Sequence, residues 1–208
     1  MLCSNCSEPV RPIVALDIDG VLGLYHEHLL AFMDGYFGRE MPRGWDGAGD
    51  WEMFLGLSRY EYRDAKLAFR QGGMKRTMPV SAGAFNIAYK AKAHGAELWI
   101  TTTRPYNRLD SVDPDTREWL HRNHIDSYHL LYDEHKYDRL GLIVDRKRVV
   151  FVLDDLPEMV AEAQRNFRDS AFLLTRPHNA AGKSQRRLPN LVVAQDIMID
   201  NIKNWSTA

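Results

Sequence analysis

The chain has 208 residues, of which 45% are apolar, and its formal net charge at pH 7 is −1. This length and composition are sufficient for a substantial hydrophobic core. The near-neutral charge excludes the strong electrostatic attraction expected of a non-specific nucleic-acid binder. Only two cysteines occur and no apolar run reaches membrane-spanning length, while the N-terminus has no signal-peptide core. We therefore expect a soluble, cytoplasmic protein with no membrane partner.

The first eleven residues are predicted to form an N-terminal tail. Cys3 and Cys6 make a Cys-x-x-Cys pair there, which is half of a zinc site or a redox dithiol. No second cysteine pair exists, and His26 and His28 would complete a zinc site only through an unusual arrangement. An inert tail is preferred, and zinc binding by the two thiols stays open.

Two aspartates follow the first predicted strand. Residues 13–16 are a short apolar run typical of a buried parallel strand, and the chain continues as Asp17-Ile18-Asp19-Gly20. Open α/β sheets bind ligands at this carboxyl edge, and Gly20 allows a sharp turn there. Two carboxylates one residue apart repel each other unless a cation or a shared proton offsets them. The pattern indicates a Mg²⁺ site with one carboxylate free to attack phosphorus, although two solvated acids at a strand end are the alternative.

Residues 23–78 are far more than a crossover helix needs, and we expect them to form a helical cap inserted after the first strand. A first helix is predicted to end at Gly38. A second begins with the capping box Ser58-x-x-Glu61 and ends near Gly72.

A glycine-rich stretch between these helices, residues 42–51, contains Trp45 and Trp51. Two interpretations of these tryptophans remain open from the sequence. They form part of the cap's small core, or they form an apolar wall against which a substrate base stacks.

The next two candidate segments carry hydroxyl groups and a cation. A predicted strand over residues 97–102 ends in Thr102, and Thr103 and Arg104 follow it. A hydroxyl and a guanidinium at that edge can bind phosphate oxygens, although threonine clusters also reflect β-propensity alone. Lys136 lies between a predicted strand at 128–132 and a short helix, where it can neutralise the aspartates.

A second lysine competes for this role. Lys147 belongs to the basic run Arg146-Lys147-Arg148, which is more typical of a solvated turn before a strand. Lys136 is therefore preferred.

The fourth segment is the apolar run 149–153, which predicts a strand buried on both faces and ends in Asp154-Asp155. An acidic pair at a buried strand end is costly without a counter-ion, so a metal is again indicated. Further along, a strand is predicted over 171–175, followed by the turn 176–179 that could reach the rim of the site. We expect a polar surface loop over 180–187 and an extra strand at Leu191–Ala194, followed by a final helix.

The four segments, in this order, resemble the motifs of the haloacid-dehalogenase-like (HAD) phosphatases. The resemblance covers about residues 12–180 and implies a doubly wound, mostly parallel Rossmann-like α/β sheet. In that fold, residues 12–22 and 79–208 form the catalytic core and residues 23–78 form the cap.

The resemblance also implies an enzyme, a phosphoric monoester hydrolase, with assigned roles. Asp17 is the nucleophile that forms an aspartyl-phosphate, and Asp19 is the general acid and base. Mg²⁺ is the implied cofactor. It is held by Asp17, the backbone carbonyl of Asp19, and Asp154, with Asp155 in support. Phosphoryl oxygens are bound by Thr102 and Lys136, with Thr103 and Arg104 as further contacts.

Some segments of the chain are similar to particular branches of the HAD phosphatases. Residues 79–84 and 98–105 look like the 5′(3′)-deoxyribonucleotidases, while 116–120 is similar to these enzymes and to the phosphatase domain of viral polynucleotide kinase-phosphatases. The expected substrate is therefore a nucleoside (deoxy)monophosphate, with Trp45 and Trp51 as base contacts.

Two alternatives are kept. One is hydrolysis of a phosphorylated nucleic-acid 3′ end, ranked second because of the near-neutral charge. The remote one is a catalytically silent binding module. No Gly-x-x-x-x-Gly-Lys-(Ser/Thr) loop occurs in the sequence, so no P-loop kinase domain is expected.

Overall fold

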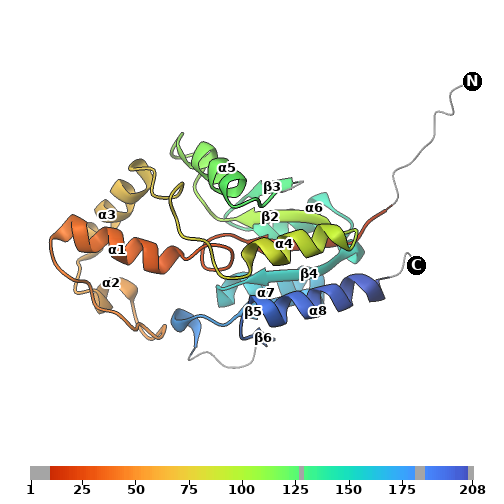
Figure 1. The fold of residues 1–208 in the computed structure, drawn as a ribbon. Coiled ribbons are helices and arrows are strands. Elements are labelled where there is room, and N and C mark those ends of the chain that lie inside the picture. Colours follow the sequence, from red (N-terminus) through yellow and green to blue (C-terminus); the bar gives the residue numbers. More distant parts are fainter. Residues whose placement is uncertain (1–9, 127–128, 181–185, 206–208) are drawn as a thin grey trace, which may run out of the picture.

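The computed structural model describes residues 10–126, 129–180 and 186–205. Its centre is a six-stranded sheet of order β3-β2-β1-β4-β5-β6, in which every neighbouring pair is parallel (Figure 1). The predicted doubly wound, Rossmann-like fold is therefore confirmed. The strands are β1 (Ile13–Asp17), β2 (Glu97–Thr102), β3 (His129–Tyr132), β4 (Val149–Asp154), β5 (Ala171–Leu174) and β6 (Arg187–Leu188).

Helices cover both faces of this sheet and bury two separate apolar clusters. Val14 and Leu16 of β1 belong to one cluster, whereas Ile13 and Ala15 belong to the other. Because successive side chains of a strand point to opposite faces, a strand between two helical layers is apolar throughout. One face is covered by α4 (Ala84–Ala93), α5 (Val112–Arg122) and α8 (Leu191–Asn204), and the other by α6 (Lys136–Ile143) and α7 (Pro157–Phe167).

Between β1 and α4 the chain forms three helices, which we call the helical insertion. They are α1 (Tyr25–Phe37), α2 (Trp51–Phe54) and α3 (Arg59–Gln71), and they lie beyond the carboxyl ends of the strands (Figure 1). The predicted capping box of Ser58 and Glu61 is formed, and α1 ends at Gly38 in the left-handed conformation. The insertion has its own apolar cluster of Leu29, Leu30, Met33, Met41, Leu55, Leu57, Ala65 and Phe69.

Two adjacent segments connect the insertion to the sheet. Gly23 and Val80 form an antiparallel bridge, and the Leu24 N–H donates to the Pro79 carbonyl over 2.8 Å. The Trp119 indole of α5 donates to the Met78 carbonyl over 2.6 Å. The chain therefore leaves and re-enters the core through one paired connection.

The extra strand predicted at Leu191–Ala194 is wrong, because these residues begin α8. The Asn190 side chain caps this helix by accepting from the N–H groups of Val192 and Val193, each over 3.0 Å. A cap and a fourteen-residue amphipathic helix outweigh the β-propensity of a short branched run. The buried positions of α8 recur at helical spacing, at Leu191, Ala194, Met198 and Ile202.

The sixth strand lies instead at Arg187–Leu188, beside β5. The predicted surface loop over 180–187 therefore ends in a strand, and its residues 181–185 lie outside the described part of the chain. Cys3 and Cys6 also lie outside it.

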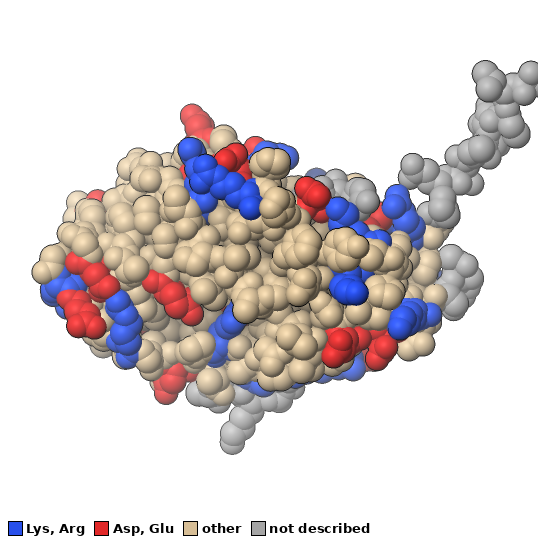
Figure 2. Space-filling view, in the orientation of Figure 1, with Lys and Arg blue, Asp and Glu red and all other residues tan. Residues whose placement is uncertain are grey.

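The surface carries charges of both signs. On the face drawn in Figure 2, Lys and Arg side chains alternate with Asp and Glu around the edges, and the middle is largely uncharged. Among the described residues, no helix is long and apolar enough to cross a membrane.

Candidate active site

Three carboxylates meet where β1 and β4 end side by side. Asp17 is the last residue of β1, Asp154 is the last residue of β4, and Asp155 follows it. Each of the three has an oxygen within 4.8 Å of an oxygen of the others, and each residue is at most 5% exposed. Because the two strands are parallel neighbours with Leu16 opposite Leu153, their acidic ends meet at one edge of the sheet.

One ammonium group faces this cluster. Lys136, the first residue of α6, contacts Asp17 Oδ1 and lies 2.7 Å from Asp154 Oδ2. Burial opposes its charge, but the two carboxylates outweigh burial and raise the pKa of Lys136 above its usual value. Lys147, the competing lysine, is exposed in the turn that precedes β4, at the other end of that strand. The geometry thus favours Lys136 over Lys147 as the partner of the aspartates.

The residues present fit a divalent cation. Three buried carboxylates outnumber one lysine, and burial together with Asp154 and Asp155 raises the pKa of Asp17 well above its usual value despite Lys136. Asp155 Oδ1 is buried without a hydrogen-bond partner among the described residues. Hard oxygen ligands of this kind suit Mg²⁺, which would offset the excess negative charge.

Asp19 lies beside this cluster, but its carboxylate is directed toward Arg104 and Lys75. Arg104 binds it with two nitrogens, over 3.0 Å from Nε and 2.6 Å from Nη2, and Lys75 Nζ lies 2.5 Å away. Burial alone would raise the pKa of Asp19, but the two cations outweigh burial and hold it well below its usual value. Burial, opposed by Asp19, lowers the pKa of Lys75 to about 7.

The residues after β2 form the adjoining wall. Thr102 is buried, and its hydroxyl oxygen accepts a hydrogen bond from the Arg104 N–H over 3.3 Å. Arg104 Nη1 donates to the Thr116 hydroxyl of α5 over 2.8 Å, which fixes the guanidinium toward Asp19. Thr103 and Arg104 border the cavity described next, whereas the buried Thr102 does not line it.

A cavity of about 240 Å³ opens over these groups, between the sheet edge and the helical insertion. The sheet edge contributes Asp17, Asp19, Thr103, Arg104, Pro105, Asp155 and Leu156, and the insertion with its return segment contributes Tyr25, His26, Tyr62, Lys66, Arg70 and Lys75. We call this space the catalytic cavity.

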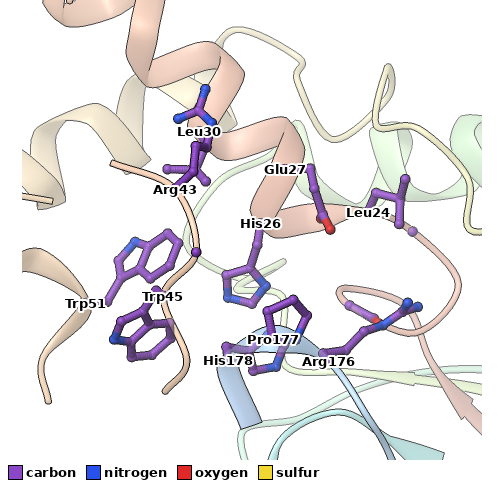
Figure 3. A pocket seen from close by; sticks show the side chains of 13 residues that line it. Leu24, His26, Glu27, Leu30, Arg43, Trp45, Trp51, Arg176, Pro177 and His178 are labelled. Carbon is purple, nitrogen blue, oxygen red and sulfur yellow. The ribbon is translucent and has the colours of Figure 1, made fainter. Parts of the chain in front are cut away.

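A second cavity of about 160 Å³ adjoins the first, and the rings of two tryptophans and two histidines are part of its lining (Figure 3). The Trp45 and Trp51 rings meet edge to face at 4.8 Å, and Trp45 stacks at 6.5 Å from the His178 ring. His26 borders both cavities. Trp51 also packs against the apolar cluster of the insertion, as expected of a residue of the cap's core, and it borders this cavity. We call this space the aromatic cavity.

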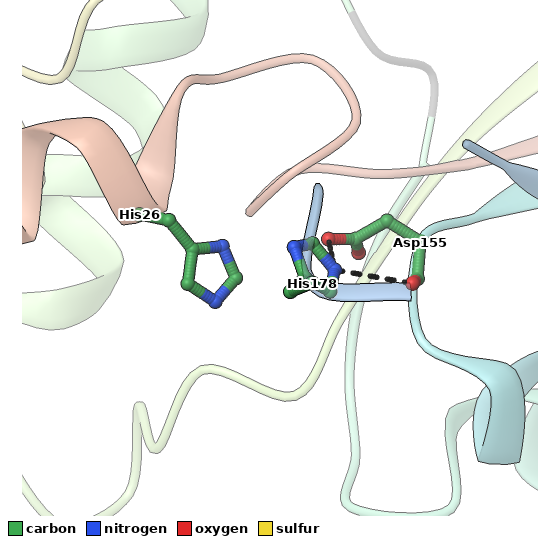
Figure 4. Close-up of side chains that lie close together, drawn as sticks. All are labelled: His26, Asp155 and His178. Atoms are coloured by element: carbon green, nitrogen blue, oxygen red, sulfur yellow. Dashed lines mark hydrogen bonds and ion pairs between the residues drawn. The ribbon is translucent and has the colours of Figure 1, made fainter. Parts of the chain in front are cut away.

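The turn after β5 reaches the rim of the site. His178 Nε2 lies 2.9 Å from Asp155 Oδ2, and the His26 ring lies 4.3 Å from the His178 ring (Figure 4). Burial, with His178 nearby, lowers the pKa of His26 to about 3. Arg176 Nε donates to the Gly20 carbonyl over 2.6 Å. This turn therefore supports both the first aspartate loop and Asp155.

Comparisons with known proteins show which fold the chain has. No protein-family model and no curated protein sequence matches the chain. Among solved structures, a protein described as a β-phosphoglucomutase from Thermotoga maritima is similar with a TM-score of 0.55 and 14% identity, over 93% of this chain and 100% of that one. CbbY from Rhodobacter sphaeroides is similar with a TM-score of 0.55 and 16% identity, over 90% and 100%. A HAD-superfamily hydrolase from Geobacter sulfurreducens has a TM-score of 0.54 and 15% identity, over 90% and 96%.

The chain has the HAD-like fold. In this HAD-like chain the structure brings together the residues that the sequence motifs singled out: Asp17, Asp19, Thr103, Arg104, Lys136, Asp154 and Asp155.

Four side chains at the site were missed by sequence reasoning. Tyr137 donates its hydroxyl to Asp154 over 2.7 Å, Lys75 and Thr116 hold the Asp19–Arg104 group, and Glu162 holds the start of α6. Only Tyr137 had a signal, its position next to Lys136. Thr116 lies in the segment 116–120, whose similarity to two branches of the family assigns it no role, and Lys75 and Glu162 come from positions with no local motif.

Proposed function

We propose that the protein is a Mg²⁺-dependent phosphomonoester hydrolase that works through an aspartyl-phosphate on Asp17. The observation that carries this proposal is the group of Asp17, Asp154 and Asp155 around one buried Lys136 at the carboxyl edge of the sheet. The HAD-like fold supports it. We also propose that residues 23–78 act as a cap, since they border both cavities.

The reaction has two steps. An Asp17 oxygen attacks phosphorus, the bond to the leaving oxygen breaks, and Asp19 gives that oxygen a proton. Water then attacks the phosphorus of the aspartyl-phosphate and gives a proton to Asp19, the bond between phosphorus and the Asp17 oxygen breaks, and inorganic phosphate leaves. Lys136 stabilises the charge that grows on the phosphoryl oxygens. Bound Mg²⁺, held by Asp17, Asp154, the Asp19 carbonyl and Asp155, would neutralise carboxylate and phosphoryl charge.

Asp19 must be protonated before it can act as the general acid. While Arg104 and Lys75 bind it, the carboxylate stays ionised. Phosphoryl oxygens entering the catalytic cavity compete for the same two cations. When they take these contacts, burial acts on Asp19 unopposed and raises its pKa, which suits a general acid.

We further propose a nucleoside monophosphate as the substrate, with a deoxynucleotide preferred. The aromatic cavity supports this choice, because Trp45 offers a ring beside His178 on which a base can stack, next to the catalytic cavity. A 3′-phosphorylated polynucleotide end ranks second, since the chain has no charge excess to neutralise many phosphates.

The activity is tested with an aryl phosphate such as p-nitrophenyl phosphate. Hydrolysis should require Mg²⁺ and cease in EDTA, and Asp17→Asn should abolish turnover in a folded protein, because an amide does not form the acyl-phosphate. Activity of folded Asp17→Asn within tenfold of wild type would contradict the assignment of the nucleophile. Complete inactivity of the wild type on all phosphomonoesters would favour a binding module instead.

The base site is tested with Trp45→Ala. Stacking is worth roughly 1–3 kcal/mol per base, so KM for a nucleotide should rise about tenfold, and KM for the aryl phosphate should rise much less. Equal losses on both substrates, with a lower Tm, would show that Trp45 is a packing residue. Indifference to mononucleotides, together with steep salt dependence on oligonucleotides, would reverse the substrate ranking.

A further inference from the structure

Two cations of α3 border the catalytic cavity without a carboxylate partner. Lys66 and Arg70 lie one helical turn apart, are half-buried, and share this cavity with Asp17 and Asp19. In the described parts of the chain, no Asp or Glu lies within ion-pair distance of either, and Arg70 Nε is buried with no hydrogen-bond partner. The Lys66 ammonium lies over the face of the Tyr62 ring, 5.0 Å from its centroid.

This arrangement is electrostatically unfavourable as it stands. Burial, with Arg70 adding repulsion, lowers the pKa of Lys66. Like charges four residues apart on a helix destabilise it, and a half-buried cation loses hydration without gaining a counter-ion. Asp19 and, more weakly, Glu52 attract the Lys66 ammonium, but neither carboxylate forms an ion pair with it. An anion bound between the two side chains would offset these costs.

The reacting phosphoryl group does not need these two cations. Lys136 lies at Asp17, where the phosphoryl group reacts, and Arg104 and Lys75 are held at Asp19 beside it. These cations come from α6, from the end of β2 and from the segment that returns to the core. Lys66 and Arg70 come from a different element, α3 of the insertion.

We propose that Lys66 and Arg70 form a second anion subsite, which binds another phosphate group of the substrate. The substrate class is then a phosphomonoester that carries a second phosphate, and the adjoining aromatic cavity makes a nucleotide with two phosphates the best fit. This inference rests on the proposed hydrolase function. The second phosphate belongs either to a small nucleoside bisphosphate or to the phosphodiester next to an oligonucleotide end.

Steady-state kinetics test the subsite through a preference ratio. The ratio is kcat/KM for deoxyadenosine 3′,5′-bisphosphate divided by kcat/KM for the better of deoxyadenosine 5′- and 3′-monophosphate. It should exceed about ten in the wild type, as expected for charge-assisted contacts. Lys66→Gln and Arg70→Gln should each lower it about tenfold. Arg63→Gln, which removes an exposed cation from the same helix, should not change it.

Arg70→Lys separates a subsite from a packing role. It keeps the charge but loses the planar fork, so its ratio should lie between those of wild type and Arg70→Gln. A ratio near one in the wild type, or unchanged ratios in both Gln variants with folding verified by circular dichroism, would overturn the proposal.

A binding measurement distinguishes failure of the subsite from failure of the hydrolase function. In the Asp17→Asn protein, calorimetry should show the bisphosphate binding at least tenfold more tightly than the monophosphates, and adding Lys66→Gln should remove the difference. This result with no turnover in the wild type would refute the hydrolase and keep the subsite. Equal affinities with normal turnover would refute the subsite alone.

A 3′-phosphorylated oligonucleotide identifies the source of the second phosphate. If it is turned over better than the bisphosphate, and loses that advantage in Lys66→Gln, the subsite takes the neighbouring phosphodiester. If the bisphosphate is better, the subsite takes a small-molecule phosphate.

Discussion

Gly20, in the loop after β1, lies directly against the Asp155 side chain. Its φ is +94°, and a Cβ at this position would lie 1.8 Å from Asp155 Oδ2 and 2.4 Å from Asp155 Cγ. Both atoms belong to a carboxylate that is buried and held by His178. A side chain at this position therefore cannot be accommodated without moving either the Asp19 loop or the acidic cluster.

We expect Gly20→Ala to lower kcat/KM for an aryl phosphate at least a hundredfold, and to reduce the free energy of unfolding by about 1–3 kcal/mol. Gly95→Ala is the matched control, because Gly95 also has a positive φ, +86°, but a Cβ there meets nothing within 4 Å. The control should lose stability and keep its activity. Chemical denaturation and initial rates measure both effects, and equal activity of the two variants would contradict this account.

At the scale of elements, α6 delivers Lys136 to the aspartates because α7 holds its N-terminus. The buried Glu162 of α7 accepts hydrogen bonds from the N–H groups of Tyr137 and Asp138, over 2.8 and 3.1 Å. Free N–H groups at a helix start need such acceptors, and the carboxylate also suits the positive end of the helix dipole.

Glu162→Ala should therefore cost about 1–3 kcal/mol of unfolding free energy and lower kcat more than it raises KM, because Lys136 loses its fixed position. Glu162→Gln keeps an acceptor oxygen and should restore most of the activity. Glu158→Ala removes an exposed acid from the same helix and should change stability by only about 0.5 kcal/mol. A KM effect alone, with normal kcat, would argue against a positioning role.

The elements that sequence predicted correctly are those whose signal is local. The strands β1, β2, β4 and β5 were predicted because buried parallel strands are short apolar runs. The helix α3 was predicted because its capping box is a pattern of only four consecutive residues. The run at Leu191–Ala194 misled because β-branched residues at a helix start look like a strand when the Asn190 cap is overlooked.

The same distinction applies to the site. Asp17, Asp154 and Lys136 were identifiable because each ends a strand or starts a helix in the expected order. Lys75 was not, because its partner Asp19 is 56 positions away and nothing near Lys75 marks it. Interactions that depend on how the insertion folds back leave no periodic or motif signal in the sequence.

For the whole molecule, a net charge of −1 conceals a strong local imbalance. Three of its acids lie together in the interior against a single lysine. The folded state without metal therefore carries a destabilising repulsion that a bound cation would remove. Because the unfolded chain lacks this site, metal binding there would add directly to folding stability.

Saturating Mg²⁺ should raise Tm by roughly 5–10 °C, since a ligand at a hundred times its Kd adds about 2.7 kcal/mol in a chain of this size. EDTA should reverse the shift. Asp155→Asn should weaken or abolish the Mg²⁺-induced rise in Tm. The control Asp169→Asn, at an exposed position, should leave this rise intact. Differential scanning fluorimetry without substrate measures this independently of turnover. An unaltered shift in Asp155→Asn would exclude Asp155 as a metal contact.

The bridge between Gly23 and Val80 has a consequence for how such a chain can diversify. The entropic cost of closing a loop grows only with the logarithm of its length once the two ends are held together. Segments of very different length and sequence can therefore be inserted between these two positions without shifting the register of β1 against β2 or β4. For the proposed hydrolase, this would let selectivity for the ester change within the insertion while the residues proposed for phosphoryl transfer stay unaltered in the core.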